Sequence, residues 1–270
     1  MILIKNAIIK IKRKVISILK RNFVFTENLT SLQNIEKIKK FIHNMQPVST
    51  ELNLIRVGSD NDGGYLIPND LQGLKYLISP GVSNNSSFEL FFAQKNVKCI
   101  LVDASVDKPN IEHKNFVFIK KFLSNEIKDN FVNIDYLISE FTSGNDDIIL
   151  QMDIEGWEWD VLKDISLETL SRFRIMTIEF HRFIRIFKDE NEFSSVVNIF
   201  EKLSKAFYIV HIHNNNCCKR IKVDELYFSD LVEITFIRKD RVKNIYGYST
   251  IPHKLDQKNV NKKDFTLKLS

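Results

Sequence analysis

Acidic and imidazole side chains directly follow three apolar runs of this sequence. An apolar run of about six residues predicts a buried strand, and residues two apart in a strand share a face. Ligands bind at the carboxyl ends of the strands in an open α/β sheet. The sequence therefore predicts that one edge of a sheet gathers the following five side chains: Asp153, Glu179, His181, His211 and His213.

Two kinds of chemistry suit these side chains. Carboxylate and imidazole ligands without thiolates favour a hard or borderline divalent ion such as Mg²⁺ or Mn²⁺. In the metal hypothesis, Asp153, Glu179 and either His211 or His213 hold the ion. In the metal-free hypothesis, His181 or His211 is a general base. A third interpretation, in which these side chains only cap strand ends and bind loops, stays open.

A turn with one glycine follows another apolar run. Ser79, Gly81 and Ser83 lie in this turn, and Asp103 ends the next run about twenty residues further on. A carboxylate at that position can accept two hydrogen bonds from a ribose diol. The turn is not the dinucleotide-binding fingerprint, because that motif needs more than one glycine.

A glycine pair stands between two short apolar stretches, residues 54–58 and 65–68. The pattern predicts a hairpin whose turn includes Asp62, Gly63, Gly64 and Tyr65. Adjacent glycines also allow the backbone to approach a ligand closely. An ordinary hairpin turn is the simpler explanation.

Apolar runs and helix-compatible segments alternate along the rest of the chain. With 270 residues, 44% of them hydrophobic, the chain can bury one α/β core. Nearly continuous apolar strands indicate a mostly parallel sheet with helices on both faces. We expect a helix over residues 31–45, strands at 74–78, 97–102, 116–122, 148–152, 175–180, 207–212 and 231–237, and further helices at 86–94, 127–141, 159–170 and 192–205.

The N-terminal arm accounts for the net charge of +5. Seven of the 39 basic residues and none of the 34 acidic residues lie in residues 1–21, so the rest of the chain gives no reason to expect nucleic acid. Apolar residues from Ile4 to Ile18 have helical spacing, but charges interrupt them too often for a membrane span or a signal peptide. The arm is either a basic helix on an anionic membrane surface or an ordinary helix that packs on the body or on a second subunit, as in a homodimer.

Four segments together resemble one known family. They are residues 60–65, residues 79–89 with Asp103 after them, the turn Met152-Asp153-Ile154-Glu155-Gly156-Trp157-Glu158, and residues 233–236. They are similar to the FkbM-type family of S-adenosylmethionine-dependent methyltransferases. The resemblance covers roughly residues 54–238 and depends mostly on the Asp-x-Glu-Gly-x-Glu turn.

The resemblance implies a class I methyltransferase (Rossmann-like) sheet of seven strands, the last antiparallel to the others. It implies that Ser79, Gly81 and Ser83 border the methionine part of S-adenosylmethionine and that Asp103 holds the ribose. Further expected cofactor contacts are Phe122, Leu123 and Ser124 at the adenine, the turn of Asp62, Gly63, Gly64 and Tyr65 at the amino-acid end, and Asp153 near the methyl group.

The resemblance also suggests the function. We expect an O-methyltransferase that acts on a sugar hydroxyl of a bacterial surface polysaccharide, of capsule or O-antigen type, or on its nucleotide-activated precursor. A bound Mg²⁺ or Mn²⁺ would lower the pKa of that hydroxyl, or a histidine would take its proton. Alternatives are methylation of a small secondary metabolite and a catalytically silent interaction module.

The expected organisation has four parts. They are a basic arm (1–25), a helical cap (26–53), the methyltransferase domain (54–240) and a polar C-terminal tail (241–270), which we expect to be loosely held over residues 254–270. Three cysteines without a CxxC pair indicate a reducing compartment, hence the cytoplasm, where the arm suits the inner membrane surface. We expect Arg172, Arg174, Arg182 and Arg185 around the same carboxyl edge of the sheet, where they either bind a phosphate or carboxylate of the acceptor or form a solvated charged face.

Overall fold

The computed structural model describes residues 23–25, 32–223 and 226–262. Most of the predicted basic arm and the residues after 262 lie outside this part of the chain. No helix within the described ranges is both long and apolar enough to cross a bilayer.

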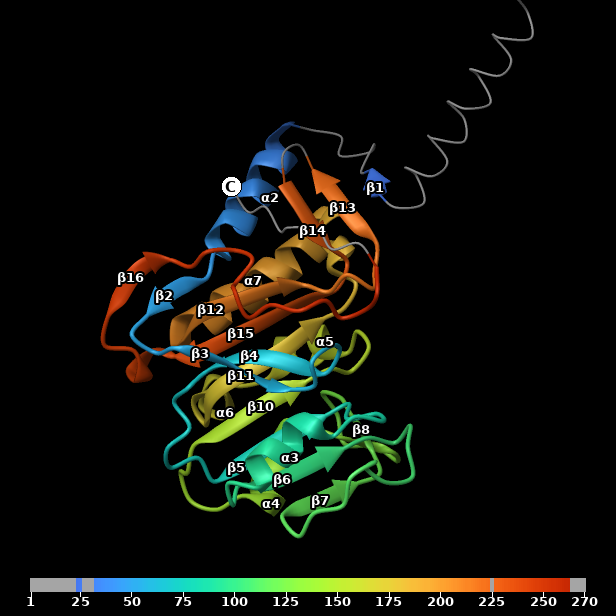
Figure 1. Cartoon of the computed structure of the whole chain (residues 1–270). Coiled ribbons are helices and arrows are strands. Elements are labelled where there is room, and N and C mark those ends of the chain that lie inside the picture. The colour runs from blue at the N-terminus through green and yellow to red at the C-terminus, as the bar shows by residue number, and fades with distance from the viewer. Residues whose placement is uncertain (1–22, 26–31, 224–225, 263–270) are drawn as a thin grey trace, which may run out of the picture.

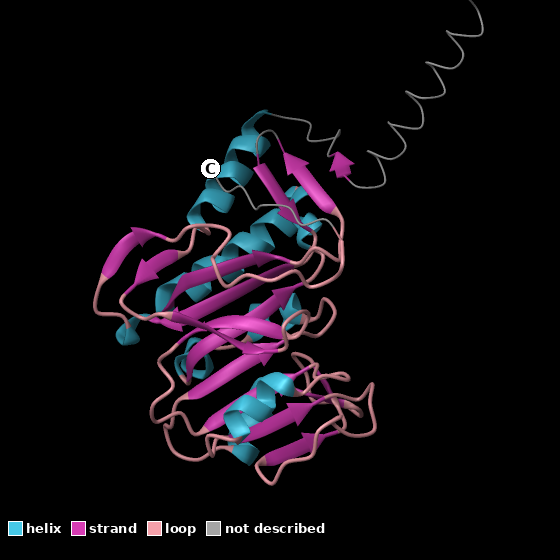
Figure 2. Ribbon diagram, in the orientation of Figure 1, coloured by secondary structure: helices cyan, strands magenta, loops and turns pink. Residues whose placement is uncertain are grey.

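A seven-stranded sheet forms the centre of the molecule (Figures 1 and 2). Its strand order is β12-β15-β11-β10-β5-β6-β7, and β15 is antiparallel to both of its neighbours while the other pairs are parallel. This confirms the predicted fold class. The strands are β5 (Tyr76–Pro80), β6 (Lys98–Val102), β7 (Phe116–Ile119), β10 (Ile148–Met152), β11 (Phe173–Phe180), β12 (Phe207–Asn214) and β15 (Val232–Arg238).

The two faces of the sheet bury separate apolar clusters. Ile148, Leu150 and Met152 of β10 point into one cluster, and Ile149 points into the other, as alternation along a strand requires. The first face packs on α2 (Leu32–Asn44), α4 (Ile134–Phe141), α5 (Glu158–Asp164), α6 (Leu167–Ser171) and α7 (Glu190–Ala206). The second face packs on α3 (Ser87–Ala93) and the hairpin of β3 (Leu54–Gly58) and β4 (Gly64–Pro68), so the predicted hairpin covers part of the sheet.

Two predicted helices begin or end at residues with capping side chains. The segment expected at 127–141 becomes helical only at Ile134, because the side chain of Asn133 caps it by accepting from Tyr136 N. The segment expected at 159–170 is two helices, since Ile165 leaves the helical region and Ser166 caps α6. Residues ahead of α4 instead form β8 (Phe122–Leu123) and β9 (Phe131–Val132).

Three short structures complete the described part. β1 (Phe23–Phe25), β13 (Arg220–Val223) and β14 (Leu226–Ser229) form a small sheet, and β2 (Val48–Thr50) pairs with β16 (Ile245–Tyr248). The 3₁₀ turn η1 (Phe183–Phe187) follows β11, and η2 (Lys239–Arg241) follows β15.

The segment after β16 is held to the sheet. Asp256 and Asn259 bind His211 and His213 of β12, and Asn259 is 6% exposed. The expectation of a loosely held tail is therefore wrong for residues 254–262. Polar composition misled the prediction because these polar side chains pair with buried imidazole and carboxylate groups.

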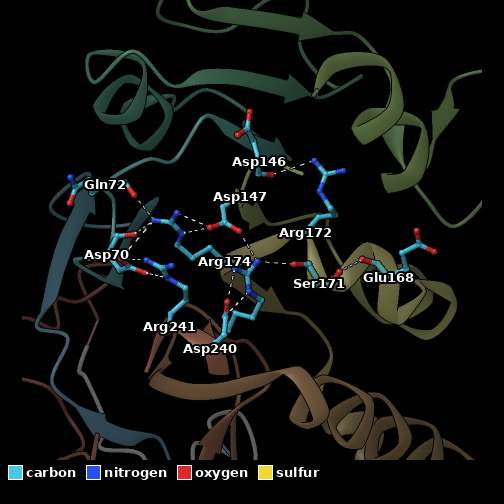
Figure 3. Close-up of polar contacts among 11 residues, drawn as sticks. Asp70, Gln72, Asp146, Asp147, Glu168, Ser171, Arg172, Arg174, Asp240 and Arg241 are labelled. Carbon is cyan, nitrogen blue, oxygen red and sulfur yellow. Dashed lines mark hydrogen bonds and ion pairs between the residues drawn. The ribbon is translucent and has the colours of Figure 1, made fainter. Parts of the chain in front are cut away.

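A network of paired arginines occupies the amino end of β11 (Figure 3). The guanidinium of Arg174 donates from Nε and Nη2 to Oδ2 of Asp147 at 2.9 and 2.7 Å, and from Nη1 to the carbonyl oxygens of Asp70 and Gln72. Burial opposes ionisation of Asp147, but Arg238 and Arg174 hold the pKa of its carboxyl below the usual value. Since Arg172 and Arg174 precede or begin β11, the expectation that they flank the carboxyl edge with Arg182 and Arg185 is wrong.

We expect Arg174→Met to lower the free energy of unfolding by about 3 kcal/mol, because it removes a buried guanidinium and leaves the half-buried carboxylate of Asp147 with one partner fewer. Urea denaturation measures the change. Lys108→Met is the control, because it breaks an ion pair whose side chains are 73% and 77% exposed and should leave the midpoint unchanged. Equal midpoints for both variants would contradict the assignment of Arg174 to the core.

Candidate active site

The turn after β5 and the turn after β10 touch through their backbones. Gly81 N donates to Val102 O at 2.9 Å, and Asp153 N donates to Pro80 O at 3.2 Å. Gly81 has φ +88°, and a Cβ there would lie 1.6 Å from the carbonyl oxygen of Asp153. Only glycine fits both constraints. The single glycine of this turn is thus required by its contact with the second turn.

A cavity of about 410 Å³ opens at this carboxyl edge. Cavities of this size are typical of small-molecule sites. One part of its wall is polar and another is aromatic, with Phe131 between Phe122 and Trp157 at centroid distances of 5.8 and 5.9 Å. The lining residues are Gly81, Ser83, Val102, Asp103, Ser105, Phe122, Leu123, Phe131, Asp153, Ile154, Glu155 and Trp157.

Asp103 is fixed at the end of β6. Its Oδ2 accepts from Ser83 N at 2.8 Å, and its Oδ1 accepts from Ser105 N and Oγ at 2.7 and 2.6 Å. A carboxylate oxygen has two lone pairs, so Oδ2 retains acceptor capacity toward the cavity. Asp103 therefore offers one acceptor site to a ribose hydroxyl.

Six of the residues predicted to contact a cofactor line the cavity: Gly81, Ser83, Asp103, Phe122, Leu123 and Asp153. Ser79 and Ser124 do not line it. The Ser79 hydroxyl is buried within hydrogen-bond distance of Glu89 and of Gln151 Oε1, and Ser124 Oγ donates to Glu126 O.

The six lining residues that sequence reasoning missed are Val102, Ser105, Phe131, Ile154, Glu155 and Trp157. The sequence could have indicated Trp157, because an aromatic residue next to a functional turn either packs in the core or faces a ligand. It is 47% exposed in the cavity wall, while Trp159 is 2% exposed in the core.

The predicted turn at Asp62, Gly63, Gly64 and Tyr65 is likewise outside the cavity lining. It lies over the neighbouring carboxylates instead, where the Tyr65 hydroxyl donates to Glu179 Oε1 at 2.9 Å. Gln151 Nε2 donates to the same hydroxyl at 3.3 Å. Tyr65 therefore links the hairpin to β10 and β11 below it.

Two sets of ligand atoms come together beside the cavity. Asp153, Glu179 and His181 form one set, and Asp62, Glu179 and Glu233 form the other, with the atoms of each set within 4.8 Å of one another. Glu179 belongs to both because Glu179 and Glu233 are Cα partners across β11 and β15. The structure thus brings Asp153 and Glu179 together with His181.

His181 has three acidic neighbours. Its Nδ1 lies 3.0 Å from Glu158 Oε1, and its Nε2 lies 3.7 Å from Asp153 Oδ1 and 3.5 Å from Glu155 Oε2. Burial opposes its protonation, but these carboxylates, Glu158 first, raise the pKa of His181 to about 9. At neutral pH the imidazole is therefore a cation.

The carboxyl groups of Asp153 and Glu179 also have raised pKa values. Burial raises the pKa of Asp153 to about 7 against the attraction of His181, and Glu155 and Glu158 add to the increase. Burial together with Asp153 and Glu233 raises the pKa of Glu179 well above its usual value. A cation bound among these groups would relieve the repulsion.

His211 and His213 are not part of either ligand set within the described residues. His211 Nε2 lies 2.8 Å from Asp256 Oδ1, and His213 Nε2 donates to Asn259 Oδ1 at 3.0 Å. The prediction that one of them joins Asp153 and Glu179 differs from this arrangement because β15 lies between β11 and β12. Asn259 Nδ2 also donates to Glu233 and Asp62, so these histidines anchor the C-terminal segment over the edge.

Comparison with known proteins decides the family. The model of the Methyltransferase FkbM domain matches residues 34–209, more than half of the chain. The chain belongs to this family of methyltransferases. The match begins within α2, earlier than residue 54, and ends in β12, before residue 238.

Other comparisons add little to this assignment. Curated proteins give no match. One matching solved structure is a mutant of the 16S rRNA (adenine(1408)-N(1))-methyltransferase from Catenulisporales acidiphilia. It has 10% identity and a TM-score of 0.30, and the match covers 72% of this chain and 98% of that one. Similarity this slight does not bear on the substrate.

A methyltransferase of the FkbM family uses S-adenosylmethionine, and the cavity fits that molecule. Asp103 offers an acceptor to a ribose, and Phe122, Phe131 and Trp157 offer a surface to an adenine ring. Asp153 lines the cavity and belongs to the Asp153, Glu179 and His181 set.

We expect Gly81→Ala to abolish binding of S-adenosylhomocysteine, because the new Cβ would push the turns after β5 and β10 apart. Isothermal titration calorimetry measures the affinity. Gly144→Ala is the matched control, since Gly144 also has positive φ (+55°) but a Cβ there meets nothing within 4 Å. An affinity for Gly81→Ala within threefold of the wild type would refute the contact, and a thermal melt would reveal a variant that fails to fold.

The anchor at His213 should depend on pH. Burial opposes its protonation, but Glu233 and Asp256 raise the pKa of His213 from 6.5 to about 9. Because the folded-state pKa is the higher one, the stabilisation is complete below pH 6.5 and is lost as the pH rises through 9. We expect the difference in unfolding free energy between wild type and His213→Gln, measured in urea, to shrink over that interval.

The Asp256→Asn background supplies the control for this titration. In this background, we expect His213→Gln to lower the free energy of unfolding by less, and the decrease should depend less on pH. A difference that stays constant from pH 6 to 9.5 would show that the charge of His213 does not hold the segment.

Proposed function

We propose that this methyltransferase transfers a methyl group from S-adenosylmethionine to a sugar hydroxyl of a bacterial surface polysaccharide or of its nucleotide-activated precursor. The observation that carries the proposal is the position of Asp153, which is shared by the cavity wall and by the cluster with Glu179 and His181. The reactive end of a cofactor in the cavity would therefore meet groups able to activate an acceptor.

A sugar hydroxyl needs such activation because it is a poor nucleophile when protonated. Bound S-adenosylmethionine supplies an electrophilic methyl group. In this proposal Asp103 holds its ribose, the aromatic wall holds its adenine, and Asp153 faces the acceptor hydroxyl.

We favour a divalent cation, Mg²⁺ or Mn²⁺, held by Asp153, Glu179 and His181. Two carboxylates and one imidazole are suitable donors once the ion displaces the proton of His181. Burial, together with neighbouring carboxylates, raises the pKa of both acids, and a cation would offset this effect. The ion would lower the pKa of the hydroxyl, and Asp62 and Glu233 would add negative charge behind Glu179.

Metal-free catalysis would need a neutral base. His181 is poorly suited because its pKa is raised to about 9, which keeps it protonated. Burial lowers the pKa of His211, but its Nε2 is engaged with Asp256. Asp153, with a pKa of about 7, is the better proton acceptor of the three.

The cellular setting is part of the same proposal. Seven basic residues within residues 1–21 support a place at the cytoplasmic face of the inner membrane, where lipid-linked glycans can be reached. The alternative proposal is that the arm packs on a second subunit and that the protein is a homodimer.

We expect Asp153→Asn and Glu179→Gln each to lower turnover at least about 100-fold while S-adenosylhomocysteine still binds. The assay incubates labelled cofactor with a panel of nucleotide-activated sugars and detects the added methyl group by mass spectrometry. Glu140→Gln, an exposed site on α4, is the control. Treatment with EDTA should abolish turnover, and Mn²⁺ should restore it.

Each part of this experiment has an outcome that would contradict the proposal. Undiminished turnover in both variants would refute the role of the cluster. Turnover that survives EDTA would refute the metal and leave Asp153 as the base. No methylated sugar from the wild type, with cofactor binding intact, would refute the sugar acceptor.

A further inference from the structure

A second cavity, of about 570 Å³, lies beside the first. Gly156 lines the second cavity, whereas its neighbours Glu155 and Trp157 line the first, so a single turn separates the two. Arg182, Arg185 and Lys188 also line the second cavity, and Arg182 directly follows His181 of the proposed ligand set. A molecule in this cavity would lie against the groups that face the acceptor.

The backbone positions Arg182 by two unusual conformations. Arg182 has φ +56°, a left-handed conformation that residues with a Cβ adopt at a cost of about 1 kcal/mol or more. Asp230 holds this shape because its backbone and side-chain oxygens accept from Phe183 N and Ile184 N at 2.9 and 2.8 Å. Gly156 (φ +107°) packs beneath, where a Cβ would lie 3.4 Å from Arg182 Nε.

The cavity has an excess of positive charge. Glu192 accepts from Arg185 Nε at 2.7 Å and from Lys188 Nζ at 3.3 Å, so one carboxylate serves two cations. The guanidinium of Arg182 has no hydrogen bond or ion pair with any residue in the described part of the chain. Asp160 is the only other acidic residue that lines the cavity. Arg182 is thus an exposed cation without an ion pair among the described residues, on a backbone held beside the proposed reaction centre.

We infer that this cavity binds an oxyanion of the acceptor, a phosphoryl group or a carboxylate, through Arg182 with support from Arg185 and Lys188. A guanidinium recognises both groups through paired N–H donors. The inference rests on the proposed function and narrows its substrate class to an anionic sugar, either nucleotide-activated or acidic.

Binding of the anion would also orient the acceptor for the reaction. Binding energy at a part of the acceptor that does not react holds the reacting hydroxyl in place. Because Arg182 and His181 are consecutive, an acceptor anchored at Arg182 would extend its sugar toward His181 and Asp153. A neutral sugar would lack this anchor.

The test measures binding and does not need turnover. The full chain is saturated with S-adenosylhomocysteine, which keeps a nucleoside out of the first cavity, and is titrated with uridine diphosphate, methyl glucuronide and neutral methyl glucoside. We expect at least one of the two anions to bind, and Arg182→Gln to raise its Kd at least tenfold. Methyl glucoside should bind no better to the wild type than to the variant.

Arg172→Gln is the matched control, because Arg172 lies at the opposite edge of the sheet and bonds to Asp146 O. It should leave the Kd of the anion unchanged. A preference for uridine diphosphate identifies a phosphoryl group, and one for methyl glucuronide identifies a carboxylate.

Equal affinity of the wild type and Arg182→Gln for both anions, or no binding of either anion to the wild type, would overturn the inference. S-adenosylhomocysteine affinity, measured for every variant, shows whether the fold is intact. Failure of the proposed function is distinct, because it appears as absent sugar methylation while anion binding at Arg182 persists.

Discussion

The contact between Gly81 and the carbonyl oxygen of Asp153 is the constraint on which the site depends. It brings the turns after β5 and β10 so close that no side chain fits between Gly81 and the backbone of Asp153. The first turn carries Ser83, which donates to Asp103, and the second carries Asp153. One backbone contact therefore sets the relative position of the proposed ribose acceptor and the group nearest the chemistry, before any ligand binds.

The second constraint is electrostatic: the fold brings several carboxylates together, and they repel one another. Glu179 and Glu233 are buried close to the half-buried Asp153, and desolvation raises the pKa of each of the three carboxyls. Replacing them with apolar residues would remove this repulsion, so the cluster is costly to the fold. A cost of this kind at the edge of a ligand cavity is typical of a functional site.

Sequence patterns predicted the sheet well because its strands are apolar on both faces. β10 matches its predicted bounds, and the antiparallel β15 follows from the family resemblance. Side-chain partners were predicted less well, because the order of strands in space cannot be read from their order in the chain. Asp153 and Glu179 meet since β10 and β11 are neighbours, whereas β15 separates His211 and His213 from them. Asp256 and Asn259 gave no periodic signal, and only the fold brings them to β12.

The two sides of the carboxyl edge then differ in what they can accept. Near β12, Asn259 joins His213, Glu233 and Asp62, so the C-terminal segment occupies that side with its polar groups satisfied by one another. Near η1, the carboxylate of Glu192 is shared by two cations and Arg182 faces a cavity. Because a satisfied network gains little from a new partner while an uncommitted cation gains much, the acceptor is expected from the side of η1. This direction places its hydroxyl beside His181 and Asp153 at the wall of the cofactor cavity, while its anion lies on the other side of the turn at Gly156.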